Sequence, residues 1–422
     1  MILISLAACG RKDSYGQSGS APKESIPSSE VTVPSPTFPE AISIPPEMTN
    51  PKGQSPIYGN SKNKDMPADL QVLSQVGKSN LEFFDSPYQP PGAVKPLEPN
   101  VVLKQTAKLG NLNDYNHLWV NIFPNLSGIK ETEKIYPAAK DPRKFELSSS
   151  DPLELIRLSD NQILATGHNI TFDLSDNSVG VGGVMKIDRA SLPFDDVLVR
   201  VPAVDRTTSI KACWNRRLIL GAKCYSYRGI FKISKRQRPN GNDFVNAVNI
   251  VEIKDYLRGV IKNEIGSDRK AMTALQAQSI AAETYALFGK IMARYTKFFE
   301  NNGYEIFSTE ESQVYIGTKS ETPETNYAVE STFGKLILYQ GKIIHAEYHA
   351  CAGGKTETVP GVPYLVAKND PGTKALARHG HGRGLSQMGA VYFSKQFQWS
   401  AEDILKYYYT GVTVSRVEGF GG

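Results

Sequence analysis

The chain has 422 residues, a formal net charge of +5 and 40% hydrophobic residues. This length allows one or two domains with enough apolar side chains for a sizeable core. The charge is too mild to indicate a nucleic-acid-binding protein. A modest positive surface suits an anionic polymer or an anionic membrane face, although an ordinary excess of lysine explains the charge equally well.

Residues 1–9 have the features of a truncated lipoprotein signal. Residues 1–8 are apolar, and Leu6-Ala7-Ala8-Cys9 resembles the bacterial lipobox. A complete signal peptide has a basic start and about 7–15 apolar residues, so we expect the true start to lie upstream of Met1. The pattern predicts a diacylglycerol on Cys9, and Gly10 favours the outer membrane of a Gram-negative envelope. The alternative is a chance Ala-Ala-Cys in a disordered tail.

Residues 10–100 are rich in Ser, Pro, Lys and Glu, and fifteen of the 26 prolines lie in the first hundred positions. Such a composition cannot bury enough apolar surface to fold. The segment is predicted to be a disordered tether between the membrane and the folded part. No segment elsewhere reaches the 18 or more apolar residues of a membrane span, so we expect attachment by the lipid anchor alone.

Residues 101–224 consist of short apolar or alternating runs separated by Asn, Asp, Gly and Pro. This pattern is typical of strands and turns, and predicts a β-rich subdomain. Cys213 and Cys224 flank residues 216–221, which have the character of a hairpin turn. Since an exported chain lives in an oxidising compartment, we expect a disulfide between them, with two buried thiols as the alternative.

Helical periodicity begins after Val251, first over residues 254–262 and then over a long stretch, 269–299, which Ser267 or Asp268 can cap. The long stretch carries a stripe of small residues, which lets other elements approach closely. Strands are expected at 334–338 and 342–350, and a closing helix at 401–408. The predicted fold class is α+β, with a long central helix wrapped by strands and preceded by the β-rich subdomain and the tether.

Glu264 is the first candidate for chemistry. It lies at the break between the two predicted helices, beside Gly266, where a side chain can face a cleft. Apolar neighbours such as Ile265 and Val260 would raise the pKa of its carboxyl, as a general acid requires. The alternative is an ordinary surface glutamate.

Residues 345–354 hold a second candidate site. In a strand, His345, Glu347, His349 and Cys351 would share one face. His and Cys bind zinc, but neighbours on one strand face are only about 7 Å apart, so a closed site would need ligands from elsewhere. We therefore predict no metal and no cofactor, and a polar face that lines a sugar groove.

The most informative stretch is residues 379–390, with four glycines in twelve residues. Glycine lets the backbone bend where side chains would clash, and between the glycines stand imidazole, guanidinium, hydroxyl and amide groups. Such a loop suits a polar ligand such as a sugar or phosphate. The alternative is a glycine-rich connector.

Together these stretches resemble the SpoIID/LytB domain family of bacterial cell-wall proteins, over residues 225–415. Glu264 lies where this family has its catalytic glutamate. The other matching stretches, in chain order, are Tyr227-Arg228-Gly229, Asp255-Tyr256-Leu257-Arg258-Gly259-Val260, Ala274-Leu275-Gln276-Ala277-Gln278, Thr284-Tyr285-Ala286-Leu287, Ser312-Gln313-Val314-Tyr315-Ile316-Gly317, Tyr348-His349, Gly353-Gly354-Lys355-Thr356-Glu357, Gly380-His381-Gly382, Ser386-Gln387-Met388-Gly389-Ala390 and Ile404-Leu405-Lys406-Tyr407-Tyr408-Tyr409.

The resemblance implies a lytic transglycosylase that cuts between N-acetylmuramic acid and N-acetylglucosamine in peptidoglycan, on peptide-free strands, and leaves anhydro-muramic ends. Glu264 would be the acid and base, and Tyr315 would stack on a sugar ring. The remaining substrate-binding residues would be His349, Gly353, Gly354, His381, Gly382, Ser386 and Gln387. The implied location is the cell envelope, on the periplasmic face of the outer membrane in a Gram-negative organism, with a cell-wall amidase as a possible partner.

Several positions depart from the family pattern. Glu283 replaces a usual arginine, Met388 a usual tryptophan and Lys262-Asn263 a frequent Pro-Ser, and the segment 371–379 is short. These departures keep alternatives open. One is a non-catalytic glycan-binding modifier of an amidase, and another is a hydrolase that uses Glu283 as a second acid. A zinc hydrolase built on His345, His349 and Cys351 is the third.

Overall fold

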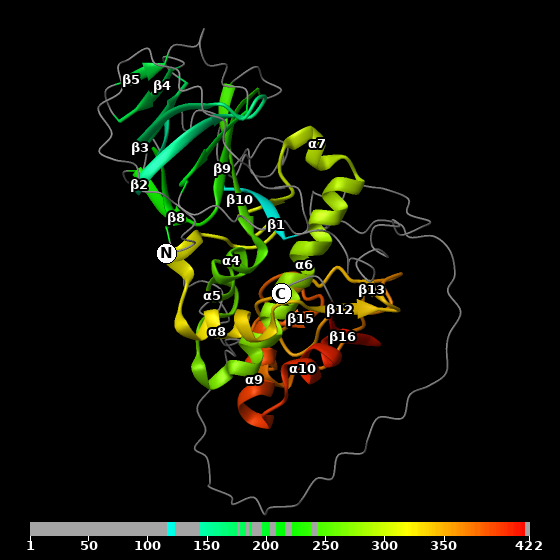
Figure 1. Ribbon diagram of the computed structural model, residues 1–422. Coiled ribbons are helices and arrows are strands. Elements are labelled where there is room, and N and C mark those ends of the chain that lie inside the picture. The colour runs from blue at the N-terminus through cyan, green and yellow to red at the C-terminus, as the bar shows by residue number, and fades with distance from the viewer. Residues whose placement is uncertain are drawn as a thin grey trace, which may run out of the picture.

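The computed structural model describes residues 116–122, 144–174, 178–182, 185–187, 196–202, 208–215, 222–237 and 243–417. The expectations for the signal remnant with Cys9 and for the tether over 10–100 lie outside the described residues. Figure 1 shows a large sheet at one end of the protein and most of the helices at the other. Among the described residues, no helix combines the length and apolarity that crossing a bilayer requires.

The large sheet has eleven strands, and its main path runs β11-β1-β10-β9-β6-β2-β3-β4-β5. The neighbouring pairs are antiparallel except β1 and β11, which are parallel. The bounds are β1 His117–Asn121, β2 Lys144–Arg157, β3 Ile163–Asp173, β4 Ser178–Val181, β5 Met185–Ile187, β6 Val197–Arg200, β7 Ile210–Asn215, β8 Ala222–Tyr227, β9 Ile230–Gln237, β10 Asp243–Glu252 and β11 Ile306–Phe307.

The sheet forks at β2. Its second half pairs with β6, whereas its first half pairs with β7, which in turn pairs with β8. Along β2 the side chains of Phe145, Leu147, Leu153 and Leu155 are fully buried, because alternate residues of a strand point to the same face. Strands from both sides of residue 225 share this sheet, so no break in the sheet marks the boundary expected between 224 and 225.

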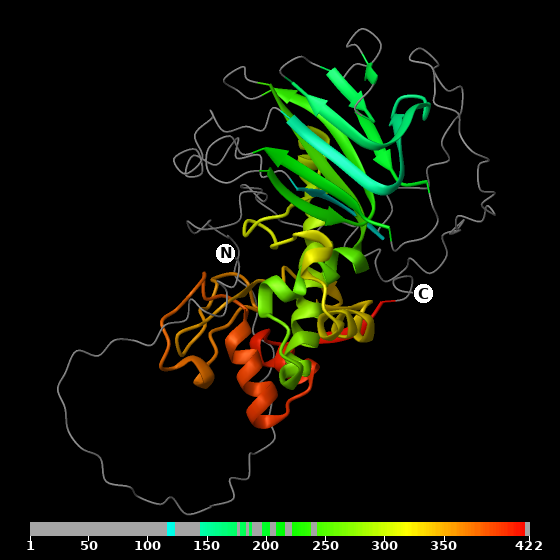
Figure 2. The same cartoon turned by 90° about the vertical axis from the view of Figure 1, so that its left-hand side faces the viewer.

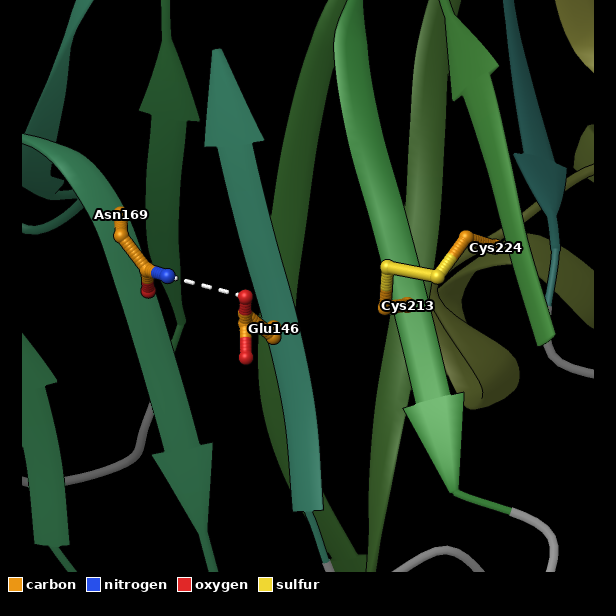
Figure 3. Close-up of a disulfide and its surroundings, with 4 residues drawn as sticks. All are labelled: Glu146, Asn169, Cys213 and Cys224. Carbon is orange, nitrogen blue, oxygen red and sulfur yellow. Dashed lines mark hydrogen bonds between the residues drawn. A yellow bond between two sulfur atoms is a disulfide. The ribbon is translucent and has the colours of Figure 1, made fainter. Parts of the chain in front are cut away.

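Cys213 and Cys224 form a disulfide, and they are directly opposite each other in the pairing of β7 with β8. Figure 3 shows this bond beside strand β2, where Glu146 is paired with Cys213 across the ladder. The Glu146 carboxylate accepts a hydrogen bond of 2.9 Å from the side-chain amide of Asn169 on β3. The covalent bond therefore closes the β7–β8 branch of the sheet.

The helices are α4 Ile253–Arg258, α5 Ile261–Ile265, α6 Met272–Tyr295, α7 Phe298–Asn302, α8 Pro323–Thr332, α9 Gln387–Phe397 and α10 Ala401–Tyr408, with 3₁₀ turns at Arg269–Ala271, Gly317–Ser320 and Pro371–Thr373. In Figure 2, α6 runs through the middle of the molecule, from the helical end up to the sheet. It packs against α8, α9, α10 and β12 and buries most of its length. Its many alanines allow these close approaches, which confirms the predicted central helix.

The predicted helix over 269–299 is divided in the structure. Asp268 accepts a hydrogen bond from the backbone N–H of Lys270, so it caps the 3₁₀ turn that precedes α6. The helix then ends at Tyr295, and α7 begins three residues later after Lys297 at a φ of 59°. The closing helix has the predicted bounds, because Ser400 and Asp403 form a capping box at its start.

Two small sheets complete the fold. One contains β12 Lys335–Tyr339, β13 Lys342–Ile343 and β16 Val412–Arg416, and the other joins β14 Tyr348–His349 to β15 Leu385–Ser386 in parallel. The prediction of one strand over 342–350 is wrong, because residues 344–347 leave the extended ladder between β13 and β14. The β14–β15 pairing has a direct consequence for the site: it places the glycine-rich stretch beside residues 348–349.

Buried charges join the sheet to the central helix. Glu305 is fully buried, and its carboxylate accepts hydrogen bonds from Lys290 at 2.9 Å and from Arg294 at 2.7 Å, both on α6. It also accepts a hydrogen bond of 3.0 Å from the backbone N–H of Trp119 on β1. Pairing with two cations and a backbone donor makes the burial of this carboxylate tolerable.

Candidate active site

Glu264 lies in the last turn of α5, which ends at Gly266 with a φ of 83°. One carboxylate oxygen accepts a hydrogen bond of 2.8 Å from the backbone N–H of Val314, and the other accepts one of 3.3 Å from the side-chain amide of Gln387. The Tyr348 hydroxyl lies close enough to this carboxyl group to lower its pKa. Three segments that are far apart in the sequence therefore meet at one acid.

Burial raises the pKa of the Glu264 carboxyl from 4.5 to about 7. The hydrogen bonds from Val314 and Gln387, and the nearby Tyr348 hydroxyl, favour the anion and lower the pKa, whereas the nearby charge of Glu310 raises it. Burial is the largest of these effects. Near neutral pH the group is present in both protonation states, which suits a residue that must both donate and accept a proton.

Asn263, the residue before the acid, fixes the position of Val314. Its side-chain amide donates to the Val314 carbonyl at 3.0 Å and to the Gly259 carbonyl at 2.9 Å, and its oxygen accepts from the Ser320 hydroxyl at 2.9 Å. Asn263 and Glu264 thus hold both polar groups of the Val314 residue. This accounts for the asparagine at a position where the family pattern often has serine.

Ser386 and Gln387 have different tasks in the structure. Ser386 is fully buried and is the N-cap of α9, because its hydroxyl accepts a hydrogen bond from the backbone N–H of Gly389. Gln387 is the first residue of the helix, and its amide contacts Glu264. The structure therefore assigns Ser386 to the support of the loop and Gln387 to the acid.

His349 is 4% exposed and neutral. Its Nδ1 lies 2.9 Å from the carbonyl oxygen of Arg383, which fixes the proton on that nitrogen. Burial, and secondly the neighbouring His381, lower the pKa of the ring to about 3. Among the described residues, the buried Nε2 has no hydrogen-bond partner, so it presents an unused acceptor. The His381 ring centre is 5.6 Å away, and this side chain is exposed.

The glycines assigned to substrate binding allow neighbouring segments to approach closely. Gly353, Gly354 and Gly382 have φ values of 68°, 103° and 79°. A Cβ at Gly353 or Gly382 would lie within 3.0–3.2 Å of Arg378. These conformations favour glycine, so the residues shape the loop that surrounds His349 and His381.

Tyr315 lies in the core. It is 2% exposed, its hydroxyl donates to Asn249 at 2.9 Å, and its ring centre is 4.8 Å from that of Tyr256 and 5.4 Å from that of Tyr227. Its ring is not open to a sugar. We therefore do not carry the predicted stacking role of Tyr315 into the proposed site.

The residues expected to share one strand face have separate environments. His345 stacks on Phe288, Glu347 forms an ion pair with Arg383 at 2.6 Å, and Cys351 is a buried free thiol. In the part of the chain that the structure describes, no group of three or more His, Cys, Asp or Glu side chains is placed to hold a metal ion.

Glu283, the second candidate acid, lies on α6 and not on α5, which carries Glu264. Its carboxyl is fully buried and accepts hydrogen bonds of 3.0 and 3.2 Å from the backbone N–H of Gly334. Its charged neighbours are Arg416 and Lys254. It is therefore bound into the junction between α8 and β12, away from the groups that hold Glu264.

Sequence reasoning gave no role to Tyr348, Gln313, Val314 or Asn263, although the quoted motifs contain the first three. Their roles come from contacts across 35 to 57 residues, for example from Gln313 to Tyr348 and from Gln313 to Tyr256. Their location within the quoted motifs was the feature of the sequence that could have indicated a role.

Comparison with known proteins agrees with the resemblance. Residues 241–339 match the family model described as stage II sporulation protein, SpoIID. An uncharacterized protein of Brachyspira hyodysenteriae is 33% identical over 129 residues, which are 29% of this chain and 33% of that protein. The amidase enhancer of Bacillus subtilis is 40% identical over 119 residues, 27% of this chain and 15% of the relative. The stage II sporulation protein D of the same organism is 22% identical over 269 residues and is matched over 77% of its length.

The chain spans a third or less of the length of the first two relatives. The family segment contains Glu264, Asn263 and Val314, whereas Tyr348 and Gln387 follow it in the sequence. The expected resemblance to the SpoIID/LytB family is thus confirmed.

Proposed function

Starting from the SpoIID-family segment at residues 241–339, we propose that this protein is a peptidoglycan lytic transglycosylase. It would cut the bond between N-acetylmuramic acid and N-acetylglucosamine in glycan strands. The observation that carries the proposal is Glu264, a partly buried carboxyl with two hydrogen-bond donors and a pKa raised to about 7. A group of this kind is matched to proton transfer at neutral pH.

The proposed reaction needs one carboxyl group. Protonated Glu264 gives its proton to the glycosidic oxygen, and the bond from C1 of the muramic residue to that oxygen breaks, with the electron pair leaving on the oxygen. The C6 hydroxyl oxygen of the same muramic residue then bonds to C1, and its proton passes to the Glu264 carboxylate. The products are an anhydro-muramic end and a free glucosamine 4-hydroxyl, and no water is consumed.

The donors around Glu264 support this cycle. After the first proton transfer the carboxylate is an anion in a partly buried site, where fixed hydrogen bonds stabilise charge more than they would in water. Val314 and Gln387 donate to opposite oxygens of the carboxylate. Because the nucleophile belongs to the substrate, no second carboxylate is required, in contrast to ordinary glycoside hydrolases.

His349 supports binding of an N-acetylated sugar. It directly follows Tyr348 in β14, and its Nε2 is an acceptor without a partner among the described residues. This buried Nε2 would have to be uncovered before it could accept a hydrogen bond from a sugar hydroxyl or acetamido N–H. His381, Gly353, Gly354 and Gly382 would form the surrounding wall of the groove.

We further propose the cell envelope as the location, through a lipid on Cys9, and peptide-free strands as the substrate. The likeness to a protein named amidase enhancer favours a second candidate function. In that case the chain would bind glycan without cutting it and act on a cell-wall amidase.

Mass spectrometry of glycan products distinguishes these functions. Purified protein would be incubated with peptide-free strands, beside Glu264→Gln and, as a matched control, Glu283→Gln. We expect anhydro-muramic ends from the wild type and from Glu283→Gln, and a loss of about 10²-fold or more in Glu264→Gln. Reducing muramic ends from the wild type would show a hydrolase instead. Binding without cleavage by any form would support the amidase modifier.

A further inference from the structure

A chain of three polar side chains ends on the proposed acid. The Tyr256 hydroxyl donates to Oε1 of Gln313 at 3.0 Å, and Nε2 of Gln313 donates to the Tyr348 hydroxyl oxygen at 2.9 Å. The Tyr348 hydroxyl is in turn close enough to Glu264 to lower the pKa of its carboxyl. Tyr256 and Gln313 are fully buried, so bulk water does not compete for these bonds.

A backbone carbonyl fixes the direction of every bond in this chain. Nε2 of Gln313 also donates to the carbonyl oxygen of Ala282 at 3.2 Å. Because a carbonyl oxygen can only accept, the atom of the Gln313 amide that faces it must be the nitrogen. The amide oxygen must then face Tyr256, which donates, and the second N–H must point at the oxygen of Tyr348.

The proton of Tyr348 is therefore directed away from Gln313, toward Glu264. A phenol oxygen that already accepts from an amide keeps its own proton for another acceptor. Burial raises the pKa of Tyr348 well above its ordinary value, so the hydroxyl keeps that proton at any physiological pH.

We propose that Gln313 is a positioning residue, which orients the Tyr348 hydroxyl as a permanent donor to the Glu264 carboxyl. This inference rests on the proposed function for its role in catalysis, since the donor stabilises the anion that forms when Glu264 releases its proton. The orientation of the Tyr348 hydroxyl by Gln313 does not depend on a bound substrate.

Gln313 lies next to another residue that acts on the acid. Val314, the next residue, supplies the backbone donor to Glu264. One dipeptide thus provides a direct donor to the acid and orients a second one through Tyr348. The ring of Tyr285 also contacts that of Tyr348, with their centres 6.0 Å apart and their planes at 61°.

The test is a direct titration of Glu264, followed by carbon-13 NMR of labelled glutamate carboxyls and assigned with Glu264→Gln. Tyr348→Phe removes the donor but keeps the ring, and Gln313→Leu removes the group that orients it. Tyr315→Phe is the matched control, because it deletes another buried hydroxyl that bonds Asn249 and not this chain. Losing a donor to an anion raises a pKa, so we expect an upward shift of about one unit in the first two variants and none in the control.

The pH profile of glycan cleavage gives a second readout. The descending limb at high pH reports loss of the proton from the acid, so in Tyr348→Phe and Gln313→Leu this limb should move upward with the titration. A purely structural defect would lower the rate at every pH and leave the limb in place.

An unchanged Glu264 titration in Tyr348→Phe overturns the inference. A shift in Tyr348→Phe without one in folded Gln313→Leu overturns the role of Gln313. Where Gln313→Leu does not fold by circular dichroism, Gln313→Met replaces it, because an uncharged thioether cannot donate to the Ala282 carbonyl or to Tyr348. If the titrations shift as expected but the wild type does not cut glycan, the geometry is supported and the proposed function fails.

Discussion

The buried carboxyl of Glu283 should make this protein less stable as the pH rises. Its side chain is fully buried, and the Gly334 N–H is the hydrogen-bond donor at its two oxygens. Burial raises the pKa of Glu283 from 4.5 to about 8, although the charges of Arg416 and Lys254 act in the opposite direction. Glutamine has nearly the same shape and no charge, so Glu283→Gln isolates the cost of ionising this group.

The sign and size follow from the two pKa values. The native state binds the proton more tightly than the unfolded state, so the contribution is fully present below pH 4.5 and is lost as the pH rises to about 8. The difference, 8 minus 4.5, is about 3.5 units, and at about 1.4 kcal/mol per unit the upper bound is about 5 kcal/mol. Relaxation around the charge reduces this bound, and we expect about 2–4 kcal/mol.

The assay is urea unfolding of both proteins at pH 5 and pH 8.5, followed by tryptophan fluorescence. Near pH 5 the two should differ by less than about 1 kcal/mol, and at pH 8.5 the variant should be more stable by about 2–4 kcal/mol. Glu300→Gln, at an exposed position, is the control and should show no such change. An equal difference between wild type and Glu283→Gln at both pH values would refute the reasoning.

Two further changes probe other parts of the structure. Asn263→Ser should lower the free energy of unfolding by about 2–3 kcal/mol and slow glycan cleavage, since a serine cannot reach both the Gly259 and Val314 carbonyls. A variant as stable in urea as the wild type would show that these two hydrogen bonds do not hold Val314 in place. Replacing both Cys213 and Cys224 by Ser should cost about 2–4 kcal/mol in the same assay, because the disulfide restricts the unfolded chain. A reductant should then destabilise only the wild type, and equal sensitivity of both proteins would disprove the assignment.

Local signals predicted the helices well. The closing helix was predicted at its observed bounds, and the structure shows that Ser400 and Asp403 form a capping box at its start. The small residues of α6 predicted its central position, because only a crowded helix needs alanine on several faces. Glu264 was found for a similar reason, since Gly266 marks the turn that ends α5.

Features set by distant contacts were not predictable in this way. Tyrosine is a residue type that often stacks on sugar rings, yet the ring of Tyr315 is covered by two other tyrosine rings. The strand expected over 342–350 breaks because β14 pairs with β15, which lies more than thirty residues later. Tyr348 is brought near the acid by the same long-range pairing, and only its place in a motif could have indicated this.

The first strand of the described fold, β1, shows that the candidate site depends on residues far upstream in the sequence. β1 lies between β10 and β11, and its residues Trp119 and Asn121 accept backbone hydrogen bonds from Glu305 and Ser308 on either side of β11. A few residues after β11 the chain reaches the dipeptide that contacts the acid. A polypeptide trimmed to the family segment would keep Glu264 but lose the strand that anchors this approach. The strand that anchors this approach therefore lies more than a hundred residues upstream of the segment that matches the family model.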